Sequence, residues 1–503
     1  MSHPLSIPAE VQRFLLRPYP RSLLLRGAPG TGKTTFALAL AEFFPGRRLF
    51  VSGRVGEGGM RDSFPWLQEP EGKGVEVVDA SRIERPVRGA LETVRQASSL
   101  LLGPQGTQEL EKFLWLPSPI QEAWSRVRDG GPTLVVIDSW TALIEHYLGF
   151  SPSSEPLPGR EDIERLLLER MGESAAHLVL VLEEEGPTHL DYLVDGVIIA
   201  SSETVDQRLE RYLKIAKLRG TRVENPVYPF TLEGGRFTAI EPLQASLGEV
   251  RVGFDPDPDP RPGLLWPGSA QAAEAFGRLP ARRLTLLEYG EGVPESVRSL
   301  VAAPMLVGAL RQGGRALVIP PPPILAENYY FALRTQFDAG TLARQLRIYP
   351  VIPSDDPPAE LEPVLVKPAA DGKGDPGEPP LFPSAKEFLF SSPGETGPLV
   401  VQFSLEALRE LAIQRGLFLE PPTFGGMMQQ FLQNRPVHVM VGGFTDDPWL
   451  PPARALAAIH LRIQDRYGRC LVYGQRPRTS GFVLMAPDPS SASRSPYQLL
   501  RVV

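Results

Sequence analysis

Cysteine, lysine and long apolar runs are scarce in this chain of 503 residues. Its single cysteine, Cys470, excludes a disulfide framework within the chain and a cysteine-rich zinc module. No run of 18 uncharged apolar residues occurs, and residues 1–20 lack the apolar segment of a signal peptide. These absences predict a soluble, cytoplasmic protein with no membrane partner. Only 8 of the 52 basic residues are lysines, and 59 acidic residues give a net charge of −7, which makes the whole chain a poor polyanion binder.

Proline, in contrast, is abundant. The 54 prolines are about twice the usual share. Because a proline inside a helix costs about 3 kcal/mol, this excess argues against a mostly helical bundle and predicts prolines in the connections. Apolar residues make up 42% of the chain, enough for real hydrophobic cores, and the length predicts about three ordinary domains or two large ones.

A phosphate-binding pattern follows the first short apolar run. Residues 22–26 (SLLLR) predict a buried strand, residues 27–34 (GAPGTGKT) match the P-loop, and residues 35–44 (TFALALAEFF) have helical composition. Glycines let backbone N–H groups face a phosphate, while Lys33 would reach its β and γ oxygens and the Thr34 hydroxyl would bind Mg²⁺. The predicted ATP site comprises Gly27, Ala28, Pro29, Gly30, Thr31, Gly32, Lys33, Thr34 and Thr35.

A second acidic position supports a magnesium site. Residues 132–138 (PTLVVID) form an apolar run that ends on Asp138, the Walker B form. At the carboxyl end of a strand beside the P-loop, this carboxylate would hold Mg²⁺ through water. The alternative is an acid that ends its strand and caps the next helix.

The order of the apolar runs predicts the fold class. Strands and helices alternate early, whereas the runs at 177–182, 196–200, 211–217 and 227–232 follow in close succession. This order predicts an α/β fold with a mainly parallel, twisted sheet flanked by helices and finished by antiparallel strands.

Four segments resemble KaiC and GvpD-type ATPases of the RecA superfamily. They are residues 27–34, 134–139 (LVVIDS), 191–198 (DYLVDGVI), and 217–220 (KLRG) followed by 229–235 (PFTLEGG). The P-loop is generic, but the third and fourth segments together are more specific, and the resemblance covers about residues 10–242. It implies an ATPase that works as a homo-oligomeric ring, a hexamer being favoured, with active sites between protomers and a protein partner.

The resemblance also implies roles for individual residues. Lys217 and Arg219 would act on the γ-phosphate bound by a neighbouring protomer, whereas without the resemblance they would be a solvated basic strand end. The family's general base is a glutamate, often one of two adjacent, after the strand that follows the P-loop helix. Here residues 51–59 (VSGRVGEGG) contain only Glu57. Glu57 is therefore the predicted base, a mobile solvent loop is the rival interpretation, and slow hydrolysis is expected.

The second half repeats the pattern weakly. Runs at 283–288, 315–319, 398–403 and 437–441 predict strands, residues 300–311 predict a helix, and residues 473–477 fall near the place of the K-x-R-G segment. Residues 289–296 (YGEGVPES) stand where a P-loop would be but lack its Lys-Thr pair, and Gln402 occupies the position expected for the metal-binding Asp. A neutral amide holds a hard cation poorly, so this half is predicted to be a non-hydrolysing RecA-like copy. An unrelated α/β domain is the alternative.

These observations give a domain map. We expect an ATP-binding RecA-like domain at 1–245, a proline-rich linker at 246–280, a degenerate RecA-like domain without a functional P-loop at 281–490, and a tail at 491–503. Residues 350–398 contain 12 prolines and predict a long irregular insertion, either mobile or used for partner contact.

Three functions remain open. A regulatory switch ATPase is favoured. A RecA-type DNA recombination ATPase would need basic mobile loops, yet residues 150–162 (FSPSSEPLPGRED) and 183–187 (EEEGP) are neutral to acidic, so nucleic acid is a possible but not favoured partner. A nucleotide-locked scaffold with negligible turnover is the third.

Overall fold

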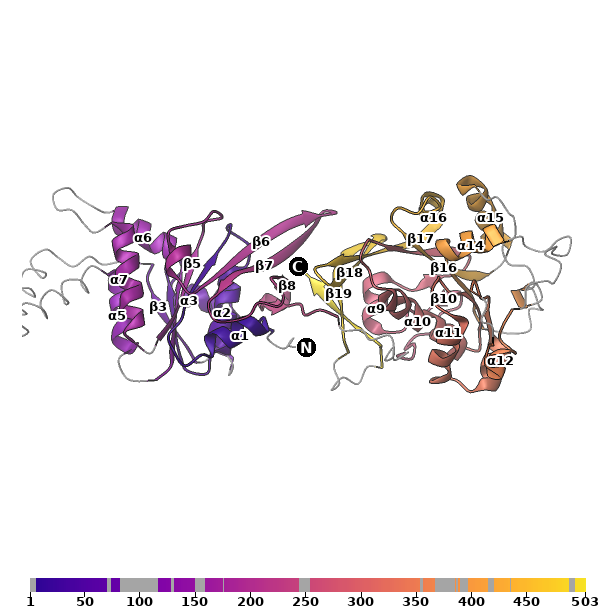
Figure 1. The fold of residues 1–503 in the computed structure, drawn as a ribbon, viewed down its shortest axis with the longest axis horizontal. Helices are drawn as coiled ribbons and strands as arrows, with labels where there is room; N and C mark the ends of the chain where they lie inside the picture. The colour runs from indigo at the N-terminus through magenta and orange to yellow at the C-terminus, as the bar shows by residue number, and fades with distance from the viewer. Residues whose placement is uncertain are drawn as a thin grey trace, which may run out of the picture. The chain divides into compact units, whose positions relative to one another are not determined.

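The computed structural model separates into two compact units, Met1–Glu241 with Val502–Val503 and Pro242–Arg501 (Figure 1). Each unit is an α/β structure built on one nine-stranded sheet, in agreement with the predicted class. The described residues are 6–69, 74–81, 116–127, 131–149, 159–174, 176–243, 254–352, 356–366, 385, 388–389, 397–414, 420–434, 436–487 and 494–503.

The sheet of the first unit has the strand order β3-β2-β4-β5-β1-β6-β7-β8-β9. Neighbours from β3 to β6 are parallel, and those from β6 to β9 are antiparallel. The strands are β1 (Ser22–Arg26), β2 (Arg47–Ser52), β3 (Val75–Asp79), β4 (Thr133–Asp138), β5 (Ala176–Leu182), β6 (Gly196–Val205), β7 (Arg208–Leu218), β8 (Val227–Thr231) and β9 (Thr238–Ala239). The central strands are buried on both faces, as their unbroken apolar runs require.

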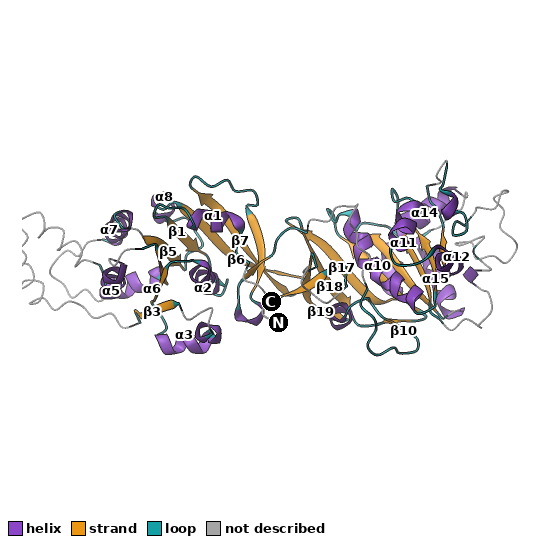
Figure 2. Cartoon of the chain, turned by 90° about the horizontal axis from the view of Figure 1, so that it is seen from below, coloured by secondary structure: helices purple, strands orange, loops and turns teal. Residues whose placement is uncertain are grey.

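Helices cover both faces of this sheet (Figure 2). One apolar core packs the sheet against α1 (Ala9–Leu15) and α2 (Lys33–Phe43). The other packs it against α5 (Ser118–Val127), α6 (Trp140–Gly149) and α7 (Arg160–Gly172). The remaining short helical segments are α3 (Glu57–Ser63), η1 (Pro65–Gln68), α8 (Leu190–Leu193) and η2 (Glu233–Gly235).

The sheet of the second unit has the order β14-β13-β15-β16-β12-β17-β18-β19-β20. Its strands are β12 (Arg283–Tyr289), β13 (Arg315–Ile319), β14 (Leu346–Ile348), β15 (Leu399–Ser404), β16 (Val437–Phe444), β17 (Ala457–Arg466), β18 (Arg469–Arg476), β19 (Arg478–Met485) and β20 (Gln498–Val502). One core contains α9 (Ala270–Phe276), α10 (Glu295–Arg311), α11 (Ala326–Arg334) and α12 (Ala339–Gln345). The other contains α14 (Leu405–Gln414), α15 (Pro421–Asn434) and α16 (Leu450–Leu456).

The two sheets have the same strand order. Each strand pair that is described in both units is parallel in both or antiparallel in both. β12 occupies the place of β1, β15 that of β4, β16 that of β5 and β17 that of β6. The correspondence extends to single residues: His177 and His438 are the second residues of β5 and β16, and each pairs with the second residue of the strand before it in the order. Both imidazoles are buried, and both have an Nδ1 atom without a hydrogen-bond partner.

Both histidines should make stability depend on pH. Burial lowers the pKa of His177 to about 4 and that of His438 to about 4, so each stays neutral in the folded chain while its unfolded form takes up a proton below about pH 6.5. Stability should therefore fall as the pH drops from 6.5 to 4, by on the order of 3 kcal/mol for each histidine.

Urea unfolding as a function of pH measures this loss. His177→Leu and His438→Leu should each flatten the slope between pH 6.5 and 4, whereas Gln429→Leu, at an exposed residue of α15 that does not titrate, should leave it unchanged. Equal slopes in all three variants would contradict the assignment. The carboxyl of Glu288, whose pKa is about 2 despite burial because His460 and Arg454 hydrogen-bond to it, acts in a separate window below pH 4.5.

Part of the expected linker is folded. Residues 254–280 contain α9 and a small sheet of β10 (Leu264–Leu265) with β11 (Leu279–Pro280), and Phe254 and Trp266 are buried in the core of the second unit. Residues 244–253 lie outside the described residues. Part of the expected tail is also a strand, because β20 joins the second sheet. In both places, buried apolar side chains supply the contacts.

The proline-rich insertion at 350–398 lies largely outside the described residues. Its described portion includes η4 (Ala359–Leu361) and several buried apolar side chains. Leu361 and Val364 belong to one core of the second unit, and Val366 and Leu389 belong to the other. These four residues are therefore part of the folded unit.

Candidate functional site

The P-loop joins the central strand β1 to α2, and its backbone requires glycine. Gly27 has φ +151°, and a Cβ atom there would lie 2.0 Å from the carbonyl oxygen of Ala200. Gly32, which precedes α2, has φ +92°, and its Cβ would lie 3.1 Å from Leu232 Cδ1. Such a loop turns its backbone toward the beginning of the helix, where N–H groups bind anions.

The two positions Gly27 and Gly30 make a matched pair for stability. Gly27→Ala should destabilise the first unit by about 3 kcal/mol or more, because backbone atoms of Ala200 must move. Gly30→Ala meets no atom within 4 Å and carries only the left-handed conformation at φ +79°, which costs about 1–2 kcal/mol. Thermal unfolding of both variants tests this order, and a more damaging Gly30→Ala would contradict it.

Lys33 lies buried against the loop. It is 6% exposed, and its Nζ donates hydrogen bonds to the carbonyl oxygens of Gly27 and Ala28 at 2.7 and 2.6 Å. Burial lowers the pKa of Lys33, while the carboxylates of Glu183 and Asp138 oppose that shift. The other predicted loop residues differ in exposure. Pro29 and Gly30 are exposed, Ala28, Gly32 and Thr34 are partly exposed, and Thr31 and Thr35 are buried.

Thr34 and Asp138, the two predicted metal ligands, are in contact. Asp138 is the last residue of β4, and its side chain is hydrogen-bonded to that of Thr34. Burial raises the pKa of Asp138, whereas the Thr34 hydrogen bond and the charge of Lys33 act in the opposite direction. A hydroxyl and a carboxylate oxygen are donors suited to Mg²⁺, which protein sites commonly hold with one or two carboxylates and substrate phosphates. The residues present therefore fit the ion.

Glu183 joins this group and was not predicted. It follows β5 directly, its side chain is 19% exposed and forms an ion pair with Arg54, and its charge acts on both Lys33 and Asp138. The signal in the sequence was an acid directly after a buried strand. We interpreted residues 183–187 only as an acidic loop.

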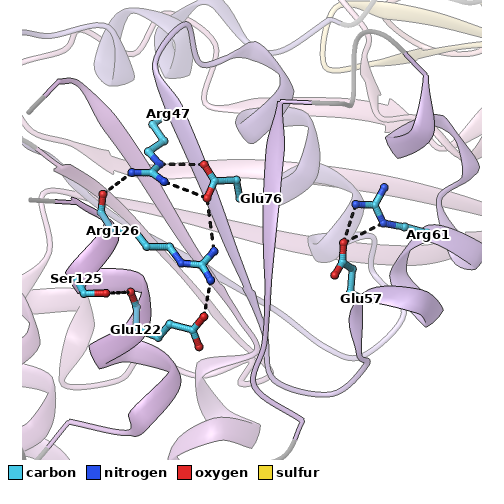
Figure 3. Close-up of polar contacts among 7 residues, drawn as sticks. All are labelled: Arg47, Glu57, Arg61, Glu76, Glu122, Ser125 and Arg126. Atoms are coloured by element: carbon cyan, nitrogen blue, oxygen red, sulfur yellow. Dashed lines mark hydrogen bonds and ion pairs between the residues drawn. The ribbon is translucent and has the colours of Figure 1, made fainter. Parts of the chain in front are cut away.

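Glu57, the predicted base, is exposed and paired with an arginine. It is the first residue of α3, its side chain is 52% exposed, and its Oε1 accepts hydrogen bonds from Arg61 at 2.7 and 3.1 Å. Figure 3 shows this pair apart from a cluster of ion pairs that joins β2, β3 and α5, formed by Arg47, Glu76, Glu122 and Arg126. The charges that act most on Lys33 come from Glu183, Asp138 and Arg54. The catalytic role of Glu57 stays a prediction.

Lys217 and Arg219 lie at the amino ends of the central parallel strands, whereas the P-loop lies at their carboxyl ends. Lys217 pairs with Val197, the second residue of β6, and Arg219 lies 3.6 Å from the carboxylate of Asp195. Asp195 in turn accepts hydrogen bonds from the backbone and hydroxyl of Ser22, where β1 begins. The P-loop follows the other end of β1, so these two cations do not meet Lys33 within one unit.

The acids of the DYLVDGVI segment hold the first unit together. Asp191 accepts a hydrogen bond from Arg26 Nε at 3.2 Å and others from Thr188. Asp195 binds the start of β1 through Ser22. The segment therefore ties the two ends of β1 to the connection between β5 and β6.

The second unit has a loop of equal length in place of the P-loop. By register, Leu287 of β12 stands where Leu25 stands in β1, which aligns residues 289–294 with 27–32. Gly292 has φ +80° where Gly30 has φ +79°. The chemistry differs, because Glu295 begins α10 where Lys33 begins α2.

The position of the second unit that corresponds to Asp138 also lacks an acid. β4 and β15 each have six residues and pair with their neighbours in the same register. Ser404 is therefore the structural equivalent of Asp138. The assignment of Gln402 to that position was therefore wrong by two residues. The inferred loss of a carboxylate is unchanged by this correction.

One cation of the K-x-R-G segment has a counterpart in the second unit. In β7 and in β18 the pairing shifts at the same place, directly before Lys217 in the first unit and directly before Arg476 in the second. Lys217 Nζ donates to the carbonyl oxygen of Val194 at 2.6 Å, and Arg476 Nη1 donates to that of Ala457 at 2.7 Å. Arg478 then corresponds to Arg219.

An ion pair is reversed between the units. In the first, Arg26 at the end of β1 pairs with Asp191 at 3.2 Å. In the second, Glu288 at the same place in β12 pairs with Arg454 at 2.7 Å. The position keeps a buried charge and exchanges its sign.

The fold and site of the first unit define a P-loop nucleotide-binding domain. Residues 11–216 match the family described as GvpD gas vesicle protein, P-loop domain. Two curated proteins of Halobacterium salinarum are similar. Protein GvpD2 is 29% identical over 245 residues (48% of this chain and 45% of that protein), and Protein GvpD1 is 27% identical over 243 residues (47% and 41%). The aligned part thus spans less than half the length of these relatives.

Length and apolar character together decide whether a helix can cross a bilayer. Among the described residues, no helix has enough of both.

Proposed function

We propose that the first unit binds ATP with Mg²⁺ and hydrolyses it slowly, as the motor of a regulatory ATPase. The observation that carries this proposal is the contact of Thr34 with Asp138 beside Lys33, at the junction of the P-loop and α2. Titration with a fluorescent ATP analogue, with and without Mg²⁺, tests binding, and phosphate release tests turnover. Binding that does not respond to Mg²⁺ would contradict the role of Thr34 and Asp138.

Each residue has a defined part in this proposal. Mg²⁺ would supply charge neutralisation at the phosphates. Thr34 and Asp138 would hold the ion, Lys33 would leave the loop carbonyls to bind phosphate oxygens, and the loop N–H groups would fix the phosphate chain. Hydrolysis also needs a carboxylate that orients water for attack on the γ-phosphorus and accepts its proton, while ADP leaves with the bridging oxygen.

Glu183 and Glu57 compete for this last role, and paired substitutions decide between them. Glu183→Gln should lower the rate at saturating ATP about 100-fold while ATP binding is kept, because Glu183 lies beside Lys33 and Asp138. Glu57→Gln should change the rate less than about threefold, because Glu57 is exposed and paired with Arg61. The reverse order would assign the base to Glu57. Negligible turnover by the wild type itself would favour the nucleotide-locked scaffold.

We further propose that active sites form between protomers of a homo-oligomer, with a hexameric ring favoured. The support is geometric, because Lys217 and Arg219 lie at the amino ends of the central strands, away from the P-loop of their own unit. Only a second protomer can bring them to the γ-phosphate. Symmetry in negative-stain images with ATP tests the ring, and a filament would overturn it.

The proposed regulatory role rests on the similarity to GvpD, whose family is described as a gas vesicle protein. We propose a protein partner in that system and a non-hydrolysing second unit that retains the RecA-like layout. The shared strand order, His177 with His438 and Lys217 with Arg476 support this layout. A pull-down from native extract with and without ATP tests the partner.

The structure gives the DNA alternative no added support. In the loop after β5, Glu183 pairs with Arg54 and Glu184 with Arg160, and Glu185 adds a third acid. Single-stranded DNA should therefore leave the ATPase rate unchanged at moderate salt. A clear stimulation would favour the recombination hypothesis.

A further inference from the structure

The second unit has a cavity where the first has its nucleotide site. It lies at the carboxyl ends of β12, β13, β15 and β16 and beside the first turns of α10, and its volume is about 30 Å³. One water needs about 10–15 Å³ on this measure, so the cavity holds about two waters or a few ligand atoms. Tyr289, which replaces the first glycine of the P-loop, is part of its wall.

Two residues of the wall each have a buried polar atom without a hydrogen-bond partner. Gln402 is 8% exposed, and its Nε2 donates to the Tyr329 hydroxyl at 3.1 Å, but its Oε1 has no donor. The side chain of Arg298 is 13% exposed, and its Nε has no acceptor. Leaving such groups unpaired is costly, so each needs a partner inside the cavity, which either water or a ligand can supply. A ligand that offers one donor and one acceptor would satisfy both.

The remaining contacts select against phosphate. Arg298 is the cation of the wall, but it already faces the Glu406 carboxylate at 4.0 Å. Glu295 stands where Lys33 stands in the first unit, and its Oε1 is also buried without a partner. Glu406 balances the Arg298 guanidinium, and Glu295, whose burial disfavours its charged form, supplies none of the positive charge that Lys33 gives the first unit, so no excess positive charge is left for an anion. A neutral ligand fits this balance.

The apolar part of the wall favours a flat ligand. The Arg298 guanidinium lies 4.9 Å from the Phe444 ring centroid and 6.0 Å from that of Tyr289. Phe444 and Tyr289 meet edge to face at 6.3 Å, so aromatic surfaces border the polar atoms. Planar groups pack well on such surfaces.

We propose that this cavity binds the amide edge of a small, neutral, planar molecule, of the class of aromatic carboxamides and lactams. The N–H of the amide would donate to Gln402 Oε1, and its carbonyl oxygen would accept from Arg298. The site is independent of ATP binding by the first unit, and it converts the lost nucleotide position into a different recognition site.

The test uses the full chain and nicotinamide as the probe, in saturation-transfer NMR and titration. Nicotinamide should bind with a dissociation constant in the millimolar range expected of so small a ligand. Nicotinate keeps the ring but replaces the amide by an anionic carboxylate, and it should bind at least about tenfold more weakly, as should inorganic phosphate. Gln402→Leu should weaken nicotinamide binding at least about tenfold, and the exposed Gln429→Leu should not.

Other outcomes would overturn the proposal. These are no binding of nicotinamide up to tens of millimolar, equal binding of nicotinate, or loss of binding in Lys33→Ala, which would place the signal in the first unit. If Gln402→Leu does not fold, Tyr329→Phe replaces it, because it removes only the hydroxyl that holds the Gln402 amide. Unchanged nicotinamide binding in the folded Tyr329→Phe variant would then overturn the proposal.

Discussion

Lys33→Ala should lower ATP hydrolysis by at least about 100-fold and remove most of the nucleotide affinity. The lysine is the cation at the head of α2, buried beside Asp138 and able to exchange the carbonyls of Gly27 and Ala28 for phosphate oxygens. Removing one preorganised donor of this kind typically costs a factor of about 10² to 10³ in rate. Phosphate release at saturating ATP and a binding titration measure the two effects.

The same variant should still fold. Burial lowers the pKa of Lys33, which means that its charge costs free energy in the folded chain, and alanine removes that cost. Wild type should gain about 2.7 kcal/mol of stability with ATP at about 100 times its dissociation constant, and Lys33→Ala should gain almost none. Lys214→Ala, an exposed lysine of β7, is the matched control and should behave as wild type. Native turnover by Lys33→Ala would refute the assigned site.

The strand and the helix that flank the P-loop could be predicted from local patterns. The run at 22–26 is β1, the run at 315–319 is β13, and the P-loop stands between strand and helix as its chemistry requires. These features depend on neighbours in the sequence: an apolar run, glycines, and a helix start. Asp138 could also be found, because an acid that ends a buried strand is a local signal.

The remaining features depend on contacts between distant segments. Glu183 reaches the site only because β5 crosses over to lie between β4 and β1, which no local pattern specifies. Gln402 was misplaced because an apolar run fixes a strand but not its register, and the pairing of β15 with β13 and β16 moves the key position to Ser404. The folded segment at 254–280 was hidden by its prolines, although Phe254 and Trp266 are buried there.

Mixing two inactive variants should restore ATP hydrolysis, and this result would distinguish sites between protomers from sites within one. Arg219→Ala alone should lower the rate about 10³-fold, the scale of an arginine finger. Lys33→Ala lacks a working P-loop but keeps Arg219, and Arg219→Ala keeps its P-loop. In a mixed oligomer, some interfaces therefore combine an intact P-loop with an intact Arg219, and phosphate release should recover toward about a quarter of the wild-type rate for equal, random mixing. At each interface, the probability of an intact P-loop is one half and that of an intact Arg219 is one half, and their product is a quarter.

The positions of Arg219 and the P-loop within the first unit explain why the mixing experiment distinguishes the two arrangements. Lys217 and Arg219 lie where β6 and β1 begin, and the P-loop lies where β1 ends. To act on the phosphate of its own unit, Arg219 would have to reach along the whole length of β1. Arg222→Ala, an exposed arginine three residues away, serves as the control and should retain activity alone. If exchange between protomers is shown by a fluorescence label and the mixture stays inactive, the interprotomer role of Arg219 is refuted, while ATP binding through Lys33 remains a separate question.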